Sequence, residues 1–380
     1  MAYTKVYWRP SQIPTGALVV LALISLAGLL MVETMRRQDT QADYGKMVTA
    51  ARQMQEGMSR VRELRVQMRQ IDTDVDPTDS GMIGVSSSPV TSLSGHLPAK
   101  QTTINPNWAA VAMKMLREAK VEKGDVVAVA VSGSFPALNL AAYTAIEQLG
   151  AEPLIIASGS ASQWGGNVPG LTWIDMAREL RKSGLINSKE IAASLGGAED
   201  RGIGVSERGR DSIRQSIERA GLAFLLPATL DEAVAKRIAL YAEYAGGRPI
   251  KAYVNIGGGS ASTGPASIDQ FFEPGLITSA RPRAFAVDSV TGHFLKQDVP
   301  VLNFSGIATI ARRYGLPLAP QVEQPIGSGG VYNTLSYRRE LAALWIFMIL
   351  VLIYIVTRIS GVVSAFGNKS EDPRRIRPTI

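Results

Sequence analysis

The sequence predicts an α/β domain of the doubly wound type, with a mainly parallel sheet and Rossmann-like topology, flanked by two transmembrane helices and an N-terminal helical stalk. Three observations predict it. From residue 106 onward, β-branched runs alternate with amphipathic segments, which is typical of a parallel sheet covered by helices. Three of these runs end in glycines and small hydroxyl residues. Each end of the chain carries a long uncharged apolar segment.

The two apolar segments predict the membrane anchors. Residues 13–32 contain no charge, and their 20 residues make a helix that crosses a hydrocarbon core of about 30 Å. We expect an uncleaved anchor, because the segment is longer than the apolar part of a signal peptide and no small-residue cleavage site follows it. Residues 341–357 predict a second span, which continues to residue 367 if Arg358 directs its charge to the headgroups.

The charge of the chain lies at its ends. Residues 1–37 contain four Lys or Arg against one Glu, and residues 338–380 contain seven against three acidic residues. The net charge of +7 therefore comes from the termini, and residues 38–337 are neutral. A neutral central domain argues against nucleic acid as a partner, and basic flanks favour the lipid bilayer.

Two spans place both termini on one side of the membrane. The basic tail over 368–380 predicts a cytoplasmic C-terminus, and with it a cytoplasmic N-terminal tail over 1–12 and an extracytoplasmic central domain. The basic residues after the first span favour the opposite orientation. Long domains, however, cross the membrane largely regardless of flanking charge, so we expect a cell-membrane protein with its domain outside.

Between the first span and the domain, the sequence predicts a stalk over 33–71 and a linker over 72–105. The stalk lacks proline, and its apolar residues, Met47 to Met68 among them, recur at a heptad-like spacing. Two interpretations remain open: a coiled coil that forms a homodimer, or a helix packed on its own domain. The linker is rich in Ser, Thr, Pro and Gly, and predicts a connection or an extended segment draped over the domain. Its acidic stretch "DTDVDPTD" lacks the glycine and glutamate of a calcium loop.

The α/β domain is expected over 106–336. The continuous apolar run over 124–131 is typical of a strand buried on both faces. Gly150 is expected to end the helix over 135–150, and Thr229 with Glu232 predicts a capping box at the start of the helix over 229–246. Helices are expected over 105–121, 135–150, 170–186, 206–221, 229–246 and 306–315, and strands over 124–131, 151–158, 222–227, 250–256, 283–288 and 299–304.

Three strand ends predict the ligand site, because ligands bind outside the carboxyl ends of parallel strands. Glycines there allow a ligand to approach the backbone, hydroxyls donate hydrogen bonds, and helix N-termini favour anions. The alternative is that Gly and Ser only form tight turns, and none of the loops has the pattern of a named phosphate loop or nucleophile elbow. The predicted ligand-binding residues are Ser132, Gly133, Ser134, Ser158, Gly159, Ser160, Gly257, Gly258, Gly259, Ser260 and Ser262.

Candidates for catalysis are few. The chain has no cysteine and two histidines, which excludes thiolate catalysis and a His-rich metal site, and we expect neither metal nor cofactor. Ser134 stands where a strand meets a helix, as a nucleophile can. Asp175, Asp288 and His293 are the candidate acid–base partners. A lone histidine in a loop is more often an ordinary polar residue.

Several blocks together resemble the bacterial poly-gamma-glutamate system protein family. They are the two apolar segments and the stretches over 124–167, 172–186 and 252–264, the last of which reads "AYVNIGGGSASTG". The resemblance implies an accessory membrane component in the synthesis or export of an anionic polymer of γ-linked glutamate, with the synthetase or export components as partners. It brings no catalytic residues, and the chain lacks the ATP-binding loop expected of the amide ligase. Two other functions remain open: an envelope hydrolase or transferase that uses the Ser134 loop, and a pure membrane scaffold.

Overall fold

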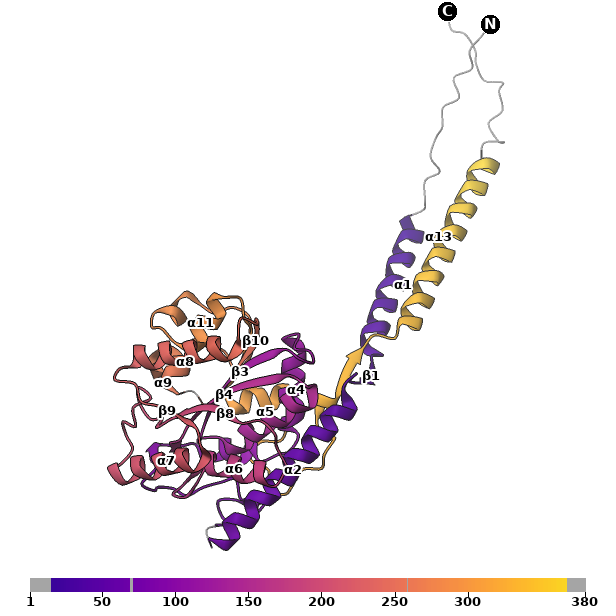
Figure 1. Cartoon of the computed structure of the whole chain (residues 1–380). Coiled ribbons are helices and arrows are strands. Elements are labelled where there is room, and N and C mark those ends of the chain that lie inside the picture. The colour runs from indigo at the N-terminus through magenta and orange to yellow at the C-terminus, as the bar shows by residue number, and fades with distance from the viewer. Residues whose placement is uncertain (1–14, 69–70, 258, 368–380) are drawn as a thin grey trace, which may run out of the picture. The chain divides into compact units, whose positions relative to one another are not determined.

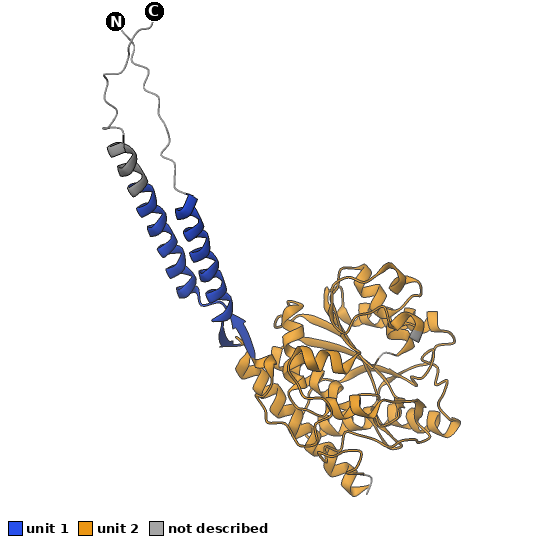
Figure 2. Cartoon of the chain, turned by 180° about the vertical axis from the view of Figure 1, so that it is seen from behind, with its two compact units in different colours: residues 1–40, 333–380 blue, residues 41–332 orange. Residues whose placement is uncertain are grey.

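The computed structural model describes residues 15–68, 71–257 and 259–367, and the predicted tails over 1–12 and 368–380 lie outside these ranges. The chain divides into two compact units, one formed by residues 1–40 with 333–380 and the other by residues 41–332 (Figure 2). Each terminal region of the chain therefore contributes to the smaller unit, and a single continuous stretch forms the larger one.

The smaller unit contains two long apolar helices. These are α1 (Thr15–Thr34) and α13 (Arg339–Gly367), and both are long and apolar enough to span a membrane. They pack on each other where Gly28 faces Trp345, since a Cβ on Gly28 would lie 2.8 Å from the indole ring. Beside them, β1 (Arg37–Thr40) pairs antiparallel with β13 (Asn333–Ser336). The pairing holds the two chain segments that enter and leave the larger unit next to each other.

The larger unit is built on a seven-stranded sheet with the order β11-β12-β10-β3-β4-β8-β9 (Figure 1). All neighbouring strands pair parallel except β11, which is antiparallel to β12. The mostly parallel sheet is thereby confirmed. The strands of this sheet are β3 (Val126–Ser132), β4 (Glu152–Ser158), β8 (Glu190–Ser194), β9 (Ala223–Leu225), β10 (Ile250–Ile256), β11 (Gly275–Ile277) and β12 (Val301–Phe304). Two short pairs are formed by β2 (Thr91–Leu93) with β5 (Ala161–Ser162) and by β6 (Asn167–Val168) with β7 (Leu171–Thr172).

Helices cover both faces of the sheet because β3 is apolar on both sides. Val127 and Val129 belong to one core, and Val126 and Ala128 belong to the other, as the twofold alternation of a strand requires. The first face carries α2 (Tyr44–Gln67), α3 (Leu97–Thr103), α4 (Trp108–Glu118), α5 (Pro136–Leu149), α6 (Trp173–Lys182), α7 (Glu207–Ala220) and α12 (Ile307–Arg313). The second carries α8 (Leu230–Ala245), α9 (Ser260–Thr263), α10 (Ala266–Asp269) and α11 (Val290–Lys296). Two short 3-10 helices are η1 (Pro282–Phe285) and η2 (Gly330–Tyr332).

One expected strand is wrong, and two strands of the seven-stranded sheet were not expected. Residues 283–288 begin within η1 rather than a strand, and Pro282 at the start of η1 has no N–H for a sheet ladder. The edge of the sheet is formed instead by β11, whose sequence Gly-Leu-Ile is too short to show a period. The strand β8 was also missed, because Glu190 and small residues make up much of it.

The predicted stalk is part of the core of the larger unit. The continuous helix expected over 33–71 is interrupted by β1, and α2 turns its apolar seam onto α4 and α5. Met54 and Val61 are fully buried there, and Gly57 lies so close to Leu140 that a Cβ would meet its side chain at 2.7 Å. Of the two interpretations, the structure shows the packed helix. The seam does not form the free face that a coiled-coil dimer requires.

The predicted linker is draped over the domain. Met82, Ile83 and Val90 are buried in the first core, and β2 pairs parallel with β5. In the acidic stretch, Asp76 accepts hydrogen bonds from the backbone N–H groups of Ser80 and Gly81, so this carboxylate closes a turn. Residues 72–105 are therefore a structural part of the larger unit.

The packed α2 gives a stability prediction. Met54→Asp puts a carboxylate into an apolar core without a partner, and we expect it to lower the free energy of unfolding by about 3 kcal/mol or more. The matched control, Val66→Asp, changes a half-exposed position of the same helix and leaves stability nearly unchanged. Thermal unfolding of the two variants checks this. Equal melting temperatures would mean that α2 does not pack on the domain.

Candidate functional site

The candidate site lies where the direction of the sheet connections reverses. From β3, the chain proceeds through β4, β8 and β9 on one side, and then continues with β10 and β12 on the other side of β3. The loops after β3 and β10 therefore leave neighbouring strands in opposite directions, which opens a crevice between them. A cavity of about 450 Å³ lies at these loops. The predicted residues that line it are Ser132, Ser134, Ser158, Ser160, Gly257, Gly259 and Ser260.

Three other predicted residues, Gly133, Gly159 and Ser262, do not line this cavity. A Cβ on Gly159 would lie 2.3 Å from the Ile213 side chain, so this glycine serves the packing of a tight turn. Gly133 similarly approaches the backbone oxygen of Ser160. Ser262 accepts a hydrogen bond from the Tyr253 hydroxyl at 3.2 Å inside the second core. Gly258 lies outside the described residues.

Gly257 brings the β10 loop against the β3 loop. Its φ of +94° is a conformation that side chains with a Cβ rarely adopt, and a Cβ there would lie 2.0 Å from Ser132 Oγ. Any other residue would force the two loops apart. The glycine that follows β10 is therefore required by the close approach of two strand-end loops, whatever the cavity binds.

The serine hydroxyls of the cavity are arranged as donors. Ser132 Oγ accepts a hydrogen bond from Ser134 N at 3.3 Å, Ser134 Oγ accepts one from Ser162 N at 3.1 Å, and Ser260 Oγ accepts one from Glu199 N at 3.3 Å. Because each oxygen already accepts a backbone N–H, its own proton remains for another acceptor. The cavity can therefore present several O–H donors to one ligand.

Lys100 supplies a cationic group to this cavity. It lies in α3, within the segment predicted to be a linker, and its side chain reaches the loops at the carboxyl ends of the strands. Nζ donates hydrogen bonds to the carbonyl oxygen of Ser134 and, at 2.8 Å, to Ser162 Oγ. The Phe135 ring covers Nζ at 3.6 Å from the ring centre. The lysine thus connects α3 with the loops that follow β3 and β4.

Burial lowers the pKa of the Lys100 amine to about 7, since only 4% of the residue is exposed. Water is replaced by an aromatic face and two oxygen acceptors, which solvate an ammonium less well than bulk water does. At neutral pH the amine is therefore present in both its charged and its neutral form. A lysine in this range can act as a cation for an anionic ligand or as a proton acceptor.

Asp200 lines another wall of the cavity and belongs to a buried ion pair. Asp200 and Arg237 are both nearly inaccessible and lie 2.8 Å apart, and Arg237 also donates to Ser158 Oγ and Ser194 Oγ. Asp200 accepts from Ser194 Oγ at 2.5 Å. Because Arg237 balances the charge of Asp200, the carboxylate does not repel an anion in the cavity. The pair fixes Ser158 at the end of β4.

The structure does not assemble the candidate catalytic residues. Asp175 caps the first turn of α6 through Thr172 and forms an ion pair with Arg219 at 2.8 Å. Asp288 is an exposed partner of Lys296. His293 lies in α11 and lines a different cavity. None of the three lines the cavity that contains Ser134, so the structure does not bring Asp175, Asp288 or His293 together with Ser134.

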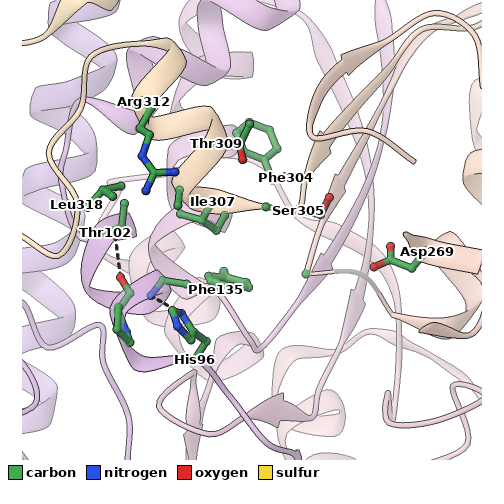
Figure 3. Close-up of a pocket in the computed structure, with 15 residues that line it drawn as sticks. His96, Thr102, Phe135, Asp269, Phe304, Ser305, Ile307, Thr309, Arg312 and Leu318 are labelled. Atoms are coloured by element: carbon green, nitrogen blue, oxygen red, sulfur yellow. Dashed lines mark hydrogen bonds between the residues drawn. The ribbon is translucent and has the colours of Figure 1, made fainter. Parts of the chain in front are cut away.

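A second cavity of about 580 Å³ adjoins the first (Figure 3). His96, Phe135 and Gly257 line both cavities, which makes them neighbouring parts of one cleft along the sheet edge. In Figure 3 the Arg312 guanidinium points toward the space between Thr102 and Ile307. Among the described residues Arg312 has no ion-pair partner. Asp269 lines the opposite side of this second cavity, and burial raises the pKa of its carboxyl group.

No protein-family model, curated protein or solved structure matches this chain. The strand-end patterns of the sequence identify the loops of the cavity, but not Lys100, Ser162 or Arg237. The one sequence signal for Lys100 is that it is a lone cation in the otherwise Ser- and Thr-rich stretch between residues 80 and 107.

The lowered pKa of Lys100 predicts a pH-dependent stability difference. Below its ordinary pKa of 10.5 and down to about 7, the unfolded state binds the proton that the folded state does not, so wild-type stability rises with pH in this window. Lys100→Met removes this dependence. The unfolding free energy of Lys100→Met minus that of the wild type should therefore fall by up to about 1.4 kcal/mol per pH unit as the pH rises. Thermal unfolding across this window measures it.

The control is Lys189→Met, which removes an exposed lysine. Its difference from the wild type should stay constant with pH. A constant difference for Lys100→Met as well would contradict a buried, neutral amine at high pH.

Proposed function

We propose that this chain is a membrane-anchored accessory component of poly-gamma-glutamate synthesis or export, and that its α/β domain binds carboxylate groups of the polymer at the sheet edge. The observation that carries the proposal is the convergence of the predicted strand-end loops on one cavity with a lysine in its wall. The resemblance of the sequence blocks to the poly-gamma-glutamate system family supplies the identity of the anion. The synthetase or export components are the proposed partners.

Neutral donors carry most of the proposed recognition. The hydroxyls of Ser132, Ser134 and Ser260 have protons available for a carboxylate, and α5 begins directly behind Ser134, so its first N–H groups favour a negative charge. Lys100 adds only part of a positive charge near pH 7. This arrangement suits a carboxylate that must also be released, because a fully charged and dry cation would hold it more tightly.

The proposal includes the topology of the chain in the membrane. We place α1 and α13 across the bilayer, both termini in the cytoplasm and the larger unit outside, where an exported polymer passes. The length and apolar character of the two helices support the spans, and the basic C-terminal tail supports the sidedness. We also assign the sheet to the Rossmann-like, doubly wound type, on the reversal of strand order between β3 and β10.

The adjoining cavity fits a ligand longer than one residue. The cleft continues from the serine-rich cavity to Arg312, whose guanidinium is available to a second carboxylate. A polymer that repeats a carboxylate along its chain can occupy both cavities at once. A pure scaffold, the alternative without a ligand, gives no reason for a cleft with this set of donors.

The first functional prediction concerns the serine donors. Ser132→Ala with Ser260→Ala removes two hydrogen bonds to a charged acceptor, each worth roughly 1.5–3 kcal/mol, so affinity for short γ-linked glutamate oligomers should fall about 100-fold or more. Calorimetry on the full-length protein in detergent measures it. Ser262→Ala is the matched control, because Ser262 lies in the same segment but faces the core. Binding of a fully methyl-esterified oligomer equal to that of the free acid would contradict carboxylate recognition.

The second functional prediction concerns chain length. Arg312→Gln should weaken the binding of long oligomers by about tenfold and leave a single γ-glutamyl unit unaffected, because only a longer chain reaches the second cavity. Arg313→Gln is the control, since this neighbouring side chain is directed to the carbonyl oxygen of Pro274. If Arg312→Gln and Arg313→Gln weaken all lengths equally, the ligand does not extend into the second cavity.

A further inference from the structure

The contact between Lys100 and Ser162 has the form of a base beside a nucleophile. Lys100 Nζ and Ser162 Oγ are 2.8 Å apart, and both residues line the 450 Å³ cavity. Among the described residues, Lys100 is the sole hydrogen-bond partner of the Ser162 hydroxyl. A serine is a weak nucleophile unless a neighbouring base takes its proton, and a neutral lysine can be that base.

We propose that Ser162 and Lys100 form a nucleophile–base pair that hydrolyses an amide or ester bond of an acyl compound bound in the cavity. The identification of that compound as a γ-glutamyl amide rests on the proposed function. The chemistry of the pair does not, because it depends only on the geometry of the two side chains. The proposal assigns an activity to Ser162, which none of the strand-end patterns identified.

The surroundings of Lys100 favour the neutral amine that a base requires. Burial lowers its pKa to about 7, and no carboxylate in the described part of the chain forms an ion pair with it. The other charged or titratable groups that line the cavity are His96 and Asp200, and Asp200 is held by Arg237. The helix α12, which packs on α3, carries the cations Arg312 and Arg313 and no carboxylate. The amine is therefore available as a proton acceptor from about neutral pH upward.

The geometry selects Ser162 rather than Ser134 as the nucleophile. Lys100 contacts the carbonyl oxygen of Ser134, which cannot react, whereas it contacts the hydroxyl of Ser162. The backbone of Ser162 is fixed on both sides, since its N–H donates to Ser134 Oγ and its carbonyl accepts from Gly165 N. The contact to the Ser134 carbonyl orients the amine toward Ser162, as a third group orients the base in other nucleophile–base pairs.

The reaction balances with water as the only co-reactant. Ser162 Oγ forms a bond to the acyl carbon while its proton passes to Lys100 Nζ, and the O–H groups of Ser132 and Ser134 can donate to the developing oxyanion. The bond to the leaving amine or alcohol then breaks, and the leaving group takes the proton from Lys100. Water attacks the acyl-Ser162 ester and gives a proton to Lys100, which returns it to Ser162 Oγ as the acid is released.

A purely structural lysine would make the same hydrogen bonds. It would hold α3 against the loops after β3 and β4 without activating Ser162. The two roles differ in their dependence on pH, because only a base makes the reactivity of Ser162 rise as Lys100 loses its proton. They also differ in the effect of Lys100→Arg, which keeps a cation in place but removes the base.

The test is covalent labelling of the full-length protein in detergent with a fluorophosphonate, which reacts with activated serines and contains no glutamate. We expect a single adduct at Ser162, identified by peptide mass, with a labelling rate that rises through about pH 7 and then levels off. Ser162→Ala, Lys100→Met and Lys100→Arg should each lower the rate by at least about 100-fold. Lys189→Arg, an exposed lysine, is the matched control and should label like the wild type.

Thermal unfolding shows whether each variant is folded. If a variant is unfolded, the pH dependence of the wild-type labelling rate tests the proposal in its place. No adduct at Ser162 in the wild type at any pH, an adduct at another serine, or undiminished labelling of folded Lys100→Arg would overturn it. Labelling at Ser162 without affinity for γ-linked glutamate oligomers would keep the nucleophile–base pair and reject the proposed polymer. Binding of the oligomers without labelling at Ser162 would keep the proposed polymer and reject the nucleophile–base pair.

Discussion

The burial of one amine, that of Lys100, holds together the loops at the carboxyl ends of the central strands. Lys100 projects from α3 under the Phe135 ring, and its two hydrogen bonds tie α3 to the loops that follow β3 and β4. Removing an ammonium from water is costly, and the cost is reduced when the amine is neutral. The burial of Lys100 accompanies the packing of the predicted linker on the domain, and it also lowers the pKa of the amine.

The fold supplies the cavity into which this amine projects. The order of the strands reverses beside β3, so the loops after β3 and β10 diverge and leave a crevice. Gly257 lets the two loops meet at Ser132 without a Cβ between them, and the buried pair of Asp200 and Arg237 fixes the end of β4. Each wall thus has a separate structural cause, and together they leave hydroxyl donors with free protons facing a single space.

The sequence predicted the parts of the molecule that have local causes. Buried apolar runs over β3, β4 and β10 end in glycine and serine, and parallel strands must bring such ends to one edge. The seam of α2 could not be resolved from the sequence, because a coiled coil and a helix packed on its own domain share nearly the same period. Lys100 could not be placed either. Its position depends on the pairing of β2 with β5, which joins residues about 70 positions apart and leaves no periodic signal.

The central claim is that the Lys100 amine is buried in the wall of a reactive or ligand-binding cavity and has a pKa of about 7. The most direct measurement is an NMR titration of the full-length protein with 13C-labelled lysine side chains, in which Lys100→Arg identifies the Lys100 signal. The account predicts that this signal titrates with a pKa of about 7, far below the other lysines, and that the pKa rises when a carboxylate ligand binds. A pKa close to the ordinary value of 10.5 would contradict the account.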